Sequence, residues 1–123
     1  MSTAADETFD EELRRVLTYT NIPVHVIDFI INEELLEQVH DLTYCTDKLL
    51  TDMRDANVQQ YVEKGETIAD AQKHWPQVVL TRLFYTRDWL KDFVNTYGYS
   101  CDPSKLTKEH FQVLPSEAFK HLQ

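Results

Sequence analysis

The chain has 123 residues, a formal net charge of −9, 42% hydrophobic residues and 11% aromatic residues. This composition can bury one sizeable core, which excludes an intrinsically disordered chain. Only two glycines and four prolines occur, whereas barrels and sandwiches need frequent turn residues. We therefore predict an all-α, single-domain bundle of about five to seven helices over residues 6–123, preceded by a disordered tail at residues 1–5.

The negative charge belongs to the first half of the chain. Residues 1–60 carry 13 acidic and 4 basic side chains, whereas residues 61–123 carry 8 of each. Such a field repels phosphate backbones and anionic lipids, so we expect a basic protein partner, no direct nucleic-acid binding and no membrane binding. The chain opens without the pattern of a secretory signal, its apolar runs are too short for a bilayer, and Cys45 and Cys101 lie far apart. These features predict free thiols and an intracellular protein, cytoplasmic or nuclear.

Helical periodicity begins at Asp6 and predicts a first helix that ends near Thr20. Pro23 is expected at the first position of a second helix, and Asn32 is expected to break it or to cap a short helix over residues 33–39. The apolar residues predicted to face the core from these helices are Phe9, Leu13, Val16, Leu17, Val26, Ile27, Ile30 and Ile31.

Thr46 is a cap-type residue, and the helix that it opens is expected to bury Leu49, Leu50 and Met53 and to stop at Gly65. Thr67 caps a modest helix with Ile68, Ala71 and Trp75 on one face. These assignments divide the predicted domain into an acidic part with short helices, residues 6–62, and a second part, residues 67–123.

The strongest segment follows Pro76 and predicts one long helix over residues 77–97, with Gly98 as its C-terminal glycine. Two short helices are expected after it, over residues 107–111 and 115–122, and their apolar residues are expected to fold back onto the core. The residues predicted to face the core from the long helix and the tail are Val79, Leu80, Leu83, Phe84, Leu90, Phe93, Val94, Tyr97, Leu106, Phe111, Leu114, Phe119 and Leu122.

The stretch "VHDLTYCTDKLL" places His40 and Cys45 near the start of a helix. A helix N-terminus stabilises a thiolate and a histidine can act as its base, which is the pattern of a thiol nucleophile. No signature of a cysteine enzyme surrounds Cys45, so a small buried residue beside Leu42 and Leu49 is the preferred interpretation.

Other chemistry is not indicated. The histidines and cysteines do not have the spacing of a zinc site, the acidic runs lack the oxygen pattern and glycine of a calcium loop, and no phosphate-binding loop occurs. We therefore expect no metal, no cofactor and no small-molecule substrate. Tyr85 and Trp89, four residues apart on the long helix among Arg82, Arg87 and Lys91, are expected at the edge of its apolar face, where they can form a binding patch.

Residues 9–53 resemble the sterile alpha motif (SAM) class of helical interaction domains. The likeness lies in "ELRRVLTYT", the turn "NIP", "VHVIDFIINEEL" and "DLTYCTDKLLTDM", with Phe29 matching the aromatic residue of the second helix and Leu42, Asp47 and Leu50 matching the segment around the fourth. Similar segments begin some mobile-element polyproteins. The resemblance implies a module that self-associates or docks a partner, with no catalytic residue to carry over.

These observations predict a non-enzymatic protein–protein interaction module whose acidic half docks a basic partner or self-associates. The residues predicted to make contact are Glu33, Glu34, Glu37, Tyr85 and Trp89. The first alternative is an acidic mimic of nucleic acid that blocks a nucleic-acid-binding protein, and the second is a thiol enzyme that uses Cys45. Carboxylates spaced like phosphates favour mimicry, whereas a mixed acidic and aromatic patch favours docking.

Overall fold

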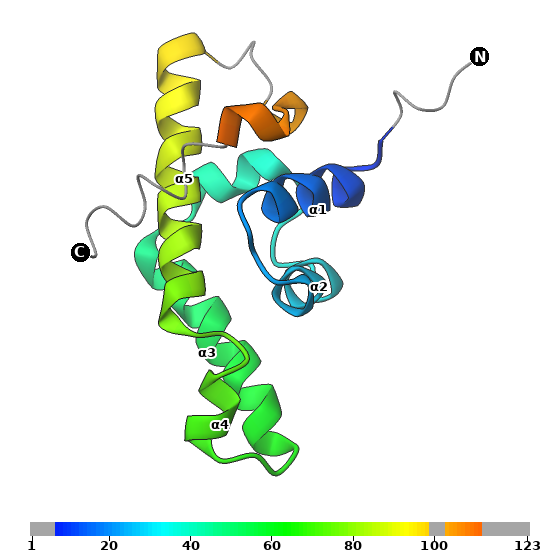
Figure 1. Ribbon diagram of the computed structural model, residues 1–123, viewed down its shortest axis with the longest axis vertical. Coiled ribbons are helices and arrows are strands. Elements are labelled where there is room, and N and C mark those ends of the chain that lie inside the picture. Colours follow the sequence, from blue (N-terminus) through cyan, green and yellow to red (C-terminus); the bar gives the residue numbers. More distant parts are fainter. Residues whose placement is uncertain (1–6, 99–102, 112–123) are drawn as a thin grey trace.

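The computed structural model describes residues 7–98 and 103–111, and its secondary structure is entirely helical, which confirms the all-α prediction (Figure 1). The predicted tail at residues 1–5 and the predicted helix over residues 115–122 lie outside the described residues, as do Leu114, Phe119, Leu122 and the side chain of Phe111. Five α-helices and three 3₁₀-helices follow one another: α1 (Phe9–Tyr19), α2 (Val24–Asn32), η1 (Val39–Tyr44), α3 (Asp47–Glu63), α4 (Ile68–Gln72), α5 (Gln77–Tyr97), η2 (Pro103–Lys105) and η3 (Lys108–Phe111).

Threonine hydroxyls open three of the α-helices. Thr8, Thr46 and Thr67 each accept a hydrogen bond from the backbone N–H three residues on, at 3.1–3.2 Å. Each bond satisfies a donor that has no partner inside the helix, which fixes where the helix begins. Pro23 is placed differently from the prediction, because it precedes the first residue of α2 in an extended conformation (φ −59°, ψ 146°).

Three α-helices end in the same hydrogen-bonded turn, the Schellman motif, in which one residue has positive φ. The positive-φ positions are Asn21 after α1, Glu34 after α2 and Gly65 after α3, at 63°, 54° and 107°. In each turn the next residue's N–H reaches the carbonyl five residues back, at 3.0–3.1 Å. The predicted stop at Gly65 is confirmed, and Asn21 and Glu34 explain how the chain ends helices with so few glycines.

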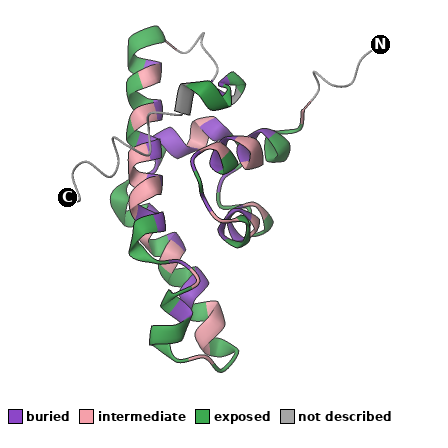
Figure 2. Ribbon diagram, viewed as in Figure 1, coloured by how far each residue is buried: buried purple, intermediate pink, exposed green. Residues whose placement is uncertain are grey.

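Most of the buried apolar side chains form one cluster at the meeting of α1, α2, η1, α3 and α5. Helix α5 stands upright in the upper part of the view, with α1 and α2 to one side of it, while α3 packs against α5 and continues below its N-terminal end to α4 (Figure 1). The buried faces of these helices turn toward one another, and the exposed positions lie at the tips and outer faces (Figure 2). Trp75, between α4 and α5, is the largest fully buried side chain, and it meets the edge of Phe29 at a ring-centroid distance of 6.3 Å.

The segment after α5 returns to the core, as predicted for Leu106, which is buried. The Arg15 guanidinium donates to the Leu106 carbonyl at 2.8 Å, and the Lys105 ammonium reaches the buried Glu12 carboxylate at 2.7 Å. Residues 108–111 form a 3₁₀-helix at the place where a short helix was predicted.

The prediction of a short helix over residues 33–39 is wrong. Asn32 is the last residue of α2, and the positive φ of Glu34 turns the chain out of the helix. The Asp41 carboxylate then accepts hydrogen bonds from the N–H groups of Glu37 and Gln38, at 3.0 and 3.1 Å. These bonds start the 3₁₀-helix η1 in place of an α-helix.

Four apolar residues predicted for the core are exposed instead, with between 45% and 63% of their surface accessible: Phe9, Leu49, Ile68 and Tyr97. All four lie in the first or last turn of a helix. In α3 the next residue, Leu50, is buried, so the core covers a face of this helix that is centred away from Leu49.

Candidate functional site

The first hollow on the surface lies where α1 begins and α2 ends. It has a volume of about 380 Å³ and is lined by the apolar residues Phe9, Ile31 and Leu36 and by the acids Asp10, Glu34 and Glu37. The positive φ of Glu34 brings the segment after α2 back toward α1 and so closes one wall of this hollow.

A second hollow of about 360 Å³ adjoins the first. The two share Glu34, Leu36 and Glu37, and the second adds Leu35, Asp41, Tyr44, Cys45 and Leu49. We call this joined surface the acidic–apolar band, defined by the lining residues of both hollows: Phe9, Asp10, Ile31, Glu34, Leu35, Leu36, Glu37, Asp41, Tyr44, Cys45 and Leu49.

Large apolar side chains stand open to solvent in this band. Phe9, Leu35, Tyr44 and Leu49 are all exposed, and Tyr44 is the most exposed of them at 66%. Isolated apolar residues are common on protein surfaces, whereas these four gather around two adjoining hollows.

The acids of the band have no cationic partner in residues 7–98 and 103–111. No Lys or Arg side chain there forms an ion pair with Asp10, Glu34, Glu37 or Asp41, whereas Glu12 pairs with Lys105 at 2.7 Å. Asp28 likewise pairs with Arg14, at 2.8 Å. The band therefore combines uncompensated negative charge with exposed apolar surface.

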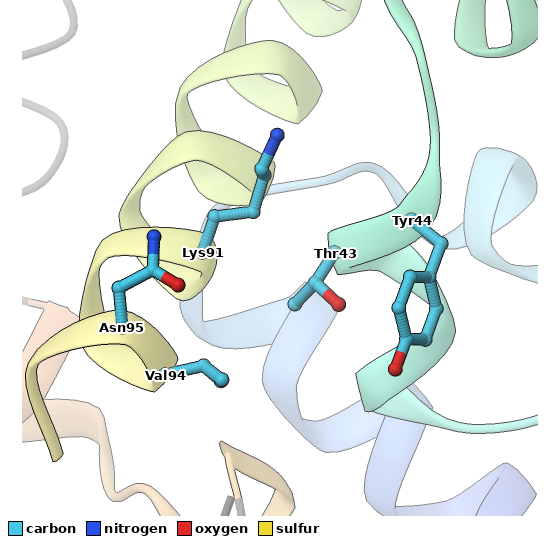
Figure 3. Close-up of a pocket in the computed structure, with 5 residues that line it drawn as sticks. All are labelled: Thr43, Tyr44, Lys91, Val94 and Asn95. Atoms are coloured by element: carbon cyan, nitrogen blue, oxygen red, sulfur yellow. The ribbon is translucent and has the colours of Figure 1, made fainter. Parts of the chain in front are cut away.

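A third hollow, of about 320 Å³, adjoins the band at Tyr44 and has a different character. It is lined by Thr43, Tyr44, Lys91, Val94 and Asn95. Figure 3 shows Lys91, Val94 and Asn95 on α5 across from Thr43 and Tyr44 on η1, with the Lys91 ammonium pointing up in the view and the Tyr44 hydroxyl pointing down. Lys91 forms no ion pair within the described part of the chain, so this hollow offers an available ammonium and, one helical turn further along α5, the carboxamide of Asn95.

The predicted contact residues fall into separate places. Glu34 and Glu37 lie in the band, whereas the Glu33 carboxylate accepts a hydrogen bond from the Gln60 side chain at 2.7 Å. Tyr85 and Trp89 are half-buried and pack against the core. The Trp89 ring also stacks on the Phe93 ring of the next helical turn, with a centroid distance of 5.7 Å.

Sequence reasoning missed the exposed residues that give the band its apolar character: it assigned Phe9 and Leu49 to the core and did not single out Leu35 or Tyr44. For two of them the sequence does contain a signal. Phe9 and Leu49 occupy the first turn of helices that begin at a capping threonine, a position from which an apolar side chain often extends past the helix's packing partners.

Cys45 is a buried thiol at the floor of the band. Burial raises the pKa of this thiol, and the Asp41 charge acts in the same direction against the opposing effect of Arg87. The thiol donates to the Asp41 carbonyl at a sulfur–oxygen distance of 3.6 Å. His40 places its ring against Tyr44, with a centroid distance of 5.8 Å. This environment favours the protonated thiol, which is the unreactive form.

Within residues 7–98 and 103–111, no group of three His, Cys, Asp or Glu side chains has the geometry to hold a metal ion. The same residues contain no helix that is both long enough and apolar enough to span a membrane.

Comparison with family models, curated proteins and solved structures finds no match to this chain. The resemblance of residues 9–53 to SAM domains therefore stays a prediction. Within that segment, Phe29, Leu42 and Leu50 are buried and Asp47 is the first residue of α3.

Proposed function

We propose that this protein is a non-enzymatic interaction module that binds a basic protein segment through the acidic–apolar band. The observation that carries the proposal is the coincidence of uncompensated carboxylates with exposed apolar side chains on two adjoining hollows. Such a surface attracts a cationic segment at long range and gains affinity from apolar contact at short range.

The band fits a protein partner better than it fits the partner of a nucleic-acid mimic. A mimic needs a row of carboxylates spaced like phosphates, whereas the acids Glu34, Glu37 and Asp41 alternate with Leu35, Leu36 and Tyr44. The mixed pattern supports docking. The buried, hydrogen-bonded state of Cys45 likewise gives no support to a thiol enzyme.

Selection from a phage-displayed library of random peptides tests this proposal. We expect the selected peptides to combine Lys or Arg with large apolar residues. Their affinity should fall about tenfold for the double variant Glu34→Lys with Glu37→Lys, because each lost attraction between exposed charges contributes up to about 1 kcal/mol.

The matched control is Asp55→Lys with Glu63→Lys, which makes the same change in net charge on exposed residues of α3 outside the band. This control should leave the affinity nearly unchanged at moderate salt, where charges beyond about 10 Å are screened. Equal losses in both double variants would show that only net charge matters. The proposal would be overturned if no peptide were selected, or if neither double variant changed the affinity of the selected peptides.

A further inference from the structure

Several backbone N–H groups in and beside the band already have hydrogen-bond partners. The N–H groups of Glu34 and Leu35 bond to carbonyls of α2, at 3.1 and 3.0 Å, and those of Glu37 and Gln38 bond to the Asp41 carboxylate. The described chain contains no β-strand, so it presents no sheet edge to which a peptide could add. A partner in extended conformation would thus leave many of its own backbone groups unpaired against the band.

An α-helix meets no such difficulty, because its backbone groups bond to one another. Recognition of helices by grooves relies on apolar side chains spaced three or four residues apart, which enter successive pockets. The band supplies adjoining hollows with Phe9, Leu35, Tyr44 and Leu49 exposed in or beside them. A basic amphipathic helix therefore fits this surface better than an extended peptide does.

The charge of the lining residues changes from negative in the first two hollows to positive in the third. This change favours one orientation of a bound helix over the opposite one. The first two hollows carry Asp10, Glu34, Glu37 and Asp41, while the third carries Lys91 and Asn95. A helix has partial positive charge at its N-terminus and partial negative charge at its C-terminus, where its last carbonyls lack partners. An ammonium and a carboxamide N–H group are suitable donors to those carbonyls.

We propose that the partner segment of the acidic–apolar band is a basic amphipathic α-helix, bound with its C-terminal end at Lys91 and Asn95. This inference rests on the proposed function and adds to it the conformation and the polarity of the partner.

The first test compares two synthetic peptides of about 18 residues, or five helical turns, with Leu repeated at spacings of three and four and Arg on both flanks of the Leu stripe. The second peptide has one central residue replaced by Pro. We expect the Pro peptide to bind about a hundredfold more weakly, because proline inside a helix removes a backbone bond and clashes with the preceding turn. Equal affinity of the two peptides overturns the helical conformation.

The second test determines the orientation of the bound helical peptide by changing the charge at each of its two ends. With the wild-type protein, a free C-terminal carboxylate should bind several-fold more tightly than a C-terminal amide, and this preference should vanish in Lys91→Gln and reverse in Lys91→Glu. The control Lys73→Glu, at an exposed residue that caps the C-terminal end of α4, should keep the preference. The proposed orientation is overturned if the Lys91 variants change the effect of N-terminal acetylation on peptide affinity and leave the effect of C-terminal amidation unchanged.

The outcomes also separate this inference from the proposed function. If the two peptides bind with equal affinity and Glu34→Lys with Glu37→Lys weakens the binding of both, the docking function stands and only the helical conformation falls. If neither peptide binds at millimolar concentration, or if both bind regardless of the band variants, the proposed function falls together with this inference.

Discussion

Replacing Glu34 by glycine should make the protein more stable, although it removes a residue from the acidic–apolar band. Glu34 has φ +54° at the turn that ends α2, a conformation in which its Cβ approaches the following carbonyl oxygen. The equivalent positions after α1 and α3 are Asn21 and Gly65, residues that tolerate positive φ. Glu34 is therefore the strained member of the three turns.

The expected gain follows from two opposing effects. Relief of the left-handed conformation contributes about 1–2 kcal/mol to the free energy of unfolding. Greater backbone freedom of glycine in the unfolded chain offsets about 0.5–1 kcal/mol of this. The net gain lies between about 0 and 1.5 kcal/mol. Its central value of about 0.7 kcal/mol raises the midpoint of thermal unfolding by about 2–4 °C in a chain of this size.

Urea and thermal unfolding followed by far-ultraviolet circular dichroism measure this change. The matched control is Glu34→Ala, which removes the same carboxylate but keeps Cβ, and should therefore bring no comparable gain. Asn21→Gly should gain less than Glu34→Gly, because asparagine tolerates positive φ. A gain in Glu34→Ala equal to that in Glu34→Gly would refute the backbone argument and assign the effect to relief of repulsion among the acids. Both Glu34 variants should bind selected basic peptides more weakly, which would place strain and function at one residue.

Three further predictions concern the core and its junction with the band. Trp75→Ala should lower the free energy of unfolding by about 3–5 kcal/mol, measured in urea, because the side chain is fully buried. Trp75→Phe should cost clearly less, since the indole N–H has no acceptor in the described structure, and equal costs would contradict this reasoning. In the folded protein the pKa of the Cys45 thiol lies above its ordinary value of 9.0, so above pH 9 the thiol ionises in the unfolded chain first. The free energy of unfolding of the wild type should therefore fall relative to that of Cys45→Ala as pH rises above 9. Parallel pH profiles of the two proteins would refute the raised pKa. Arg87→Met should destabilise the fold by about 1–3 kcal/mol, because the guanidinium donates to the Cys45 carbonyl at 3.2 Å and pairs with Asp47 at 2.6 Å. Arg87→Lys should recover little of that loss in the same unfolding assay, since an ammonium cannot reproduce the planar fork, and full recovery would show that charge alone suffices.

The helices themselves could be predicted from the sequence because their limits are set by local interactions. The hydroxyls of Thr46 and Thr67 cap the N–H groups three residues ahead, and Gly65 and Gly98 have positive φ where α3 and α5 end. A helical period of 3.6 residues was enough to assign Leu83 and other buried residues to the core face.

The candidate site could be predicted only in part. The excess of acids in the first half was visible in the sequence and pointed to Glu34 and Glu37, which do lie in the band. The same reasoning included Glu33, whose carboxylate bonds to Gln60 of α3, a partner far away in the chain. Charge counts cannot reveal which carboxylates find such a partner.

The sequence by itself determined the helical class, the long helix α5 and the sign of the field around the first half of the chain. Only the tertiary structure decided that Phe9, Tyr44 and Leu49 stay exposed and line adjoining hollows with those acids. The physical reason is that capping and periodicity act within a few residues, whereas exposure depends on which face of each helix its neighbours cover. That coverage is set by packing between segments distant in the chain, such as α5 against η1 and α1 against α2.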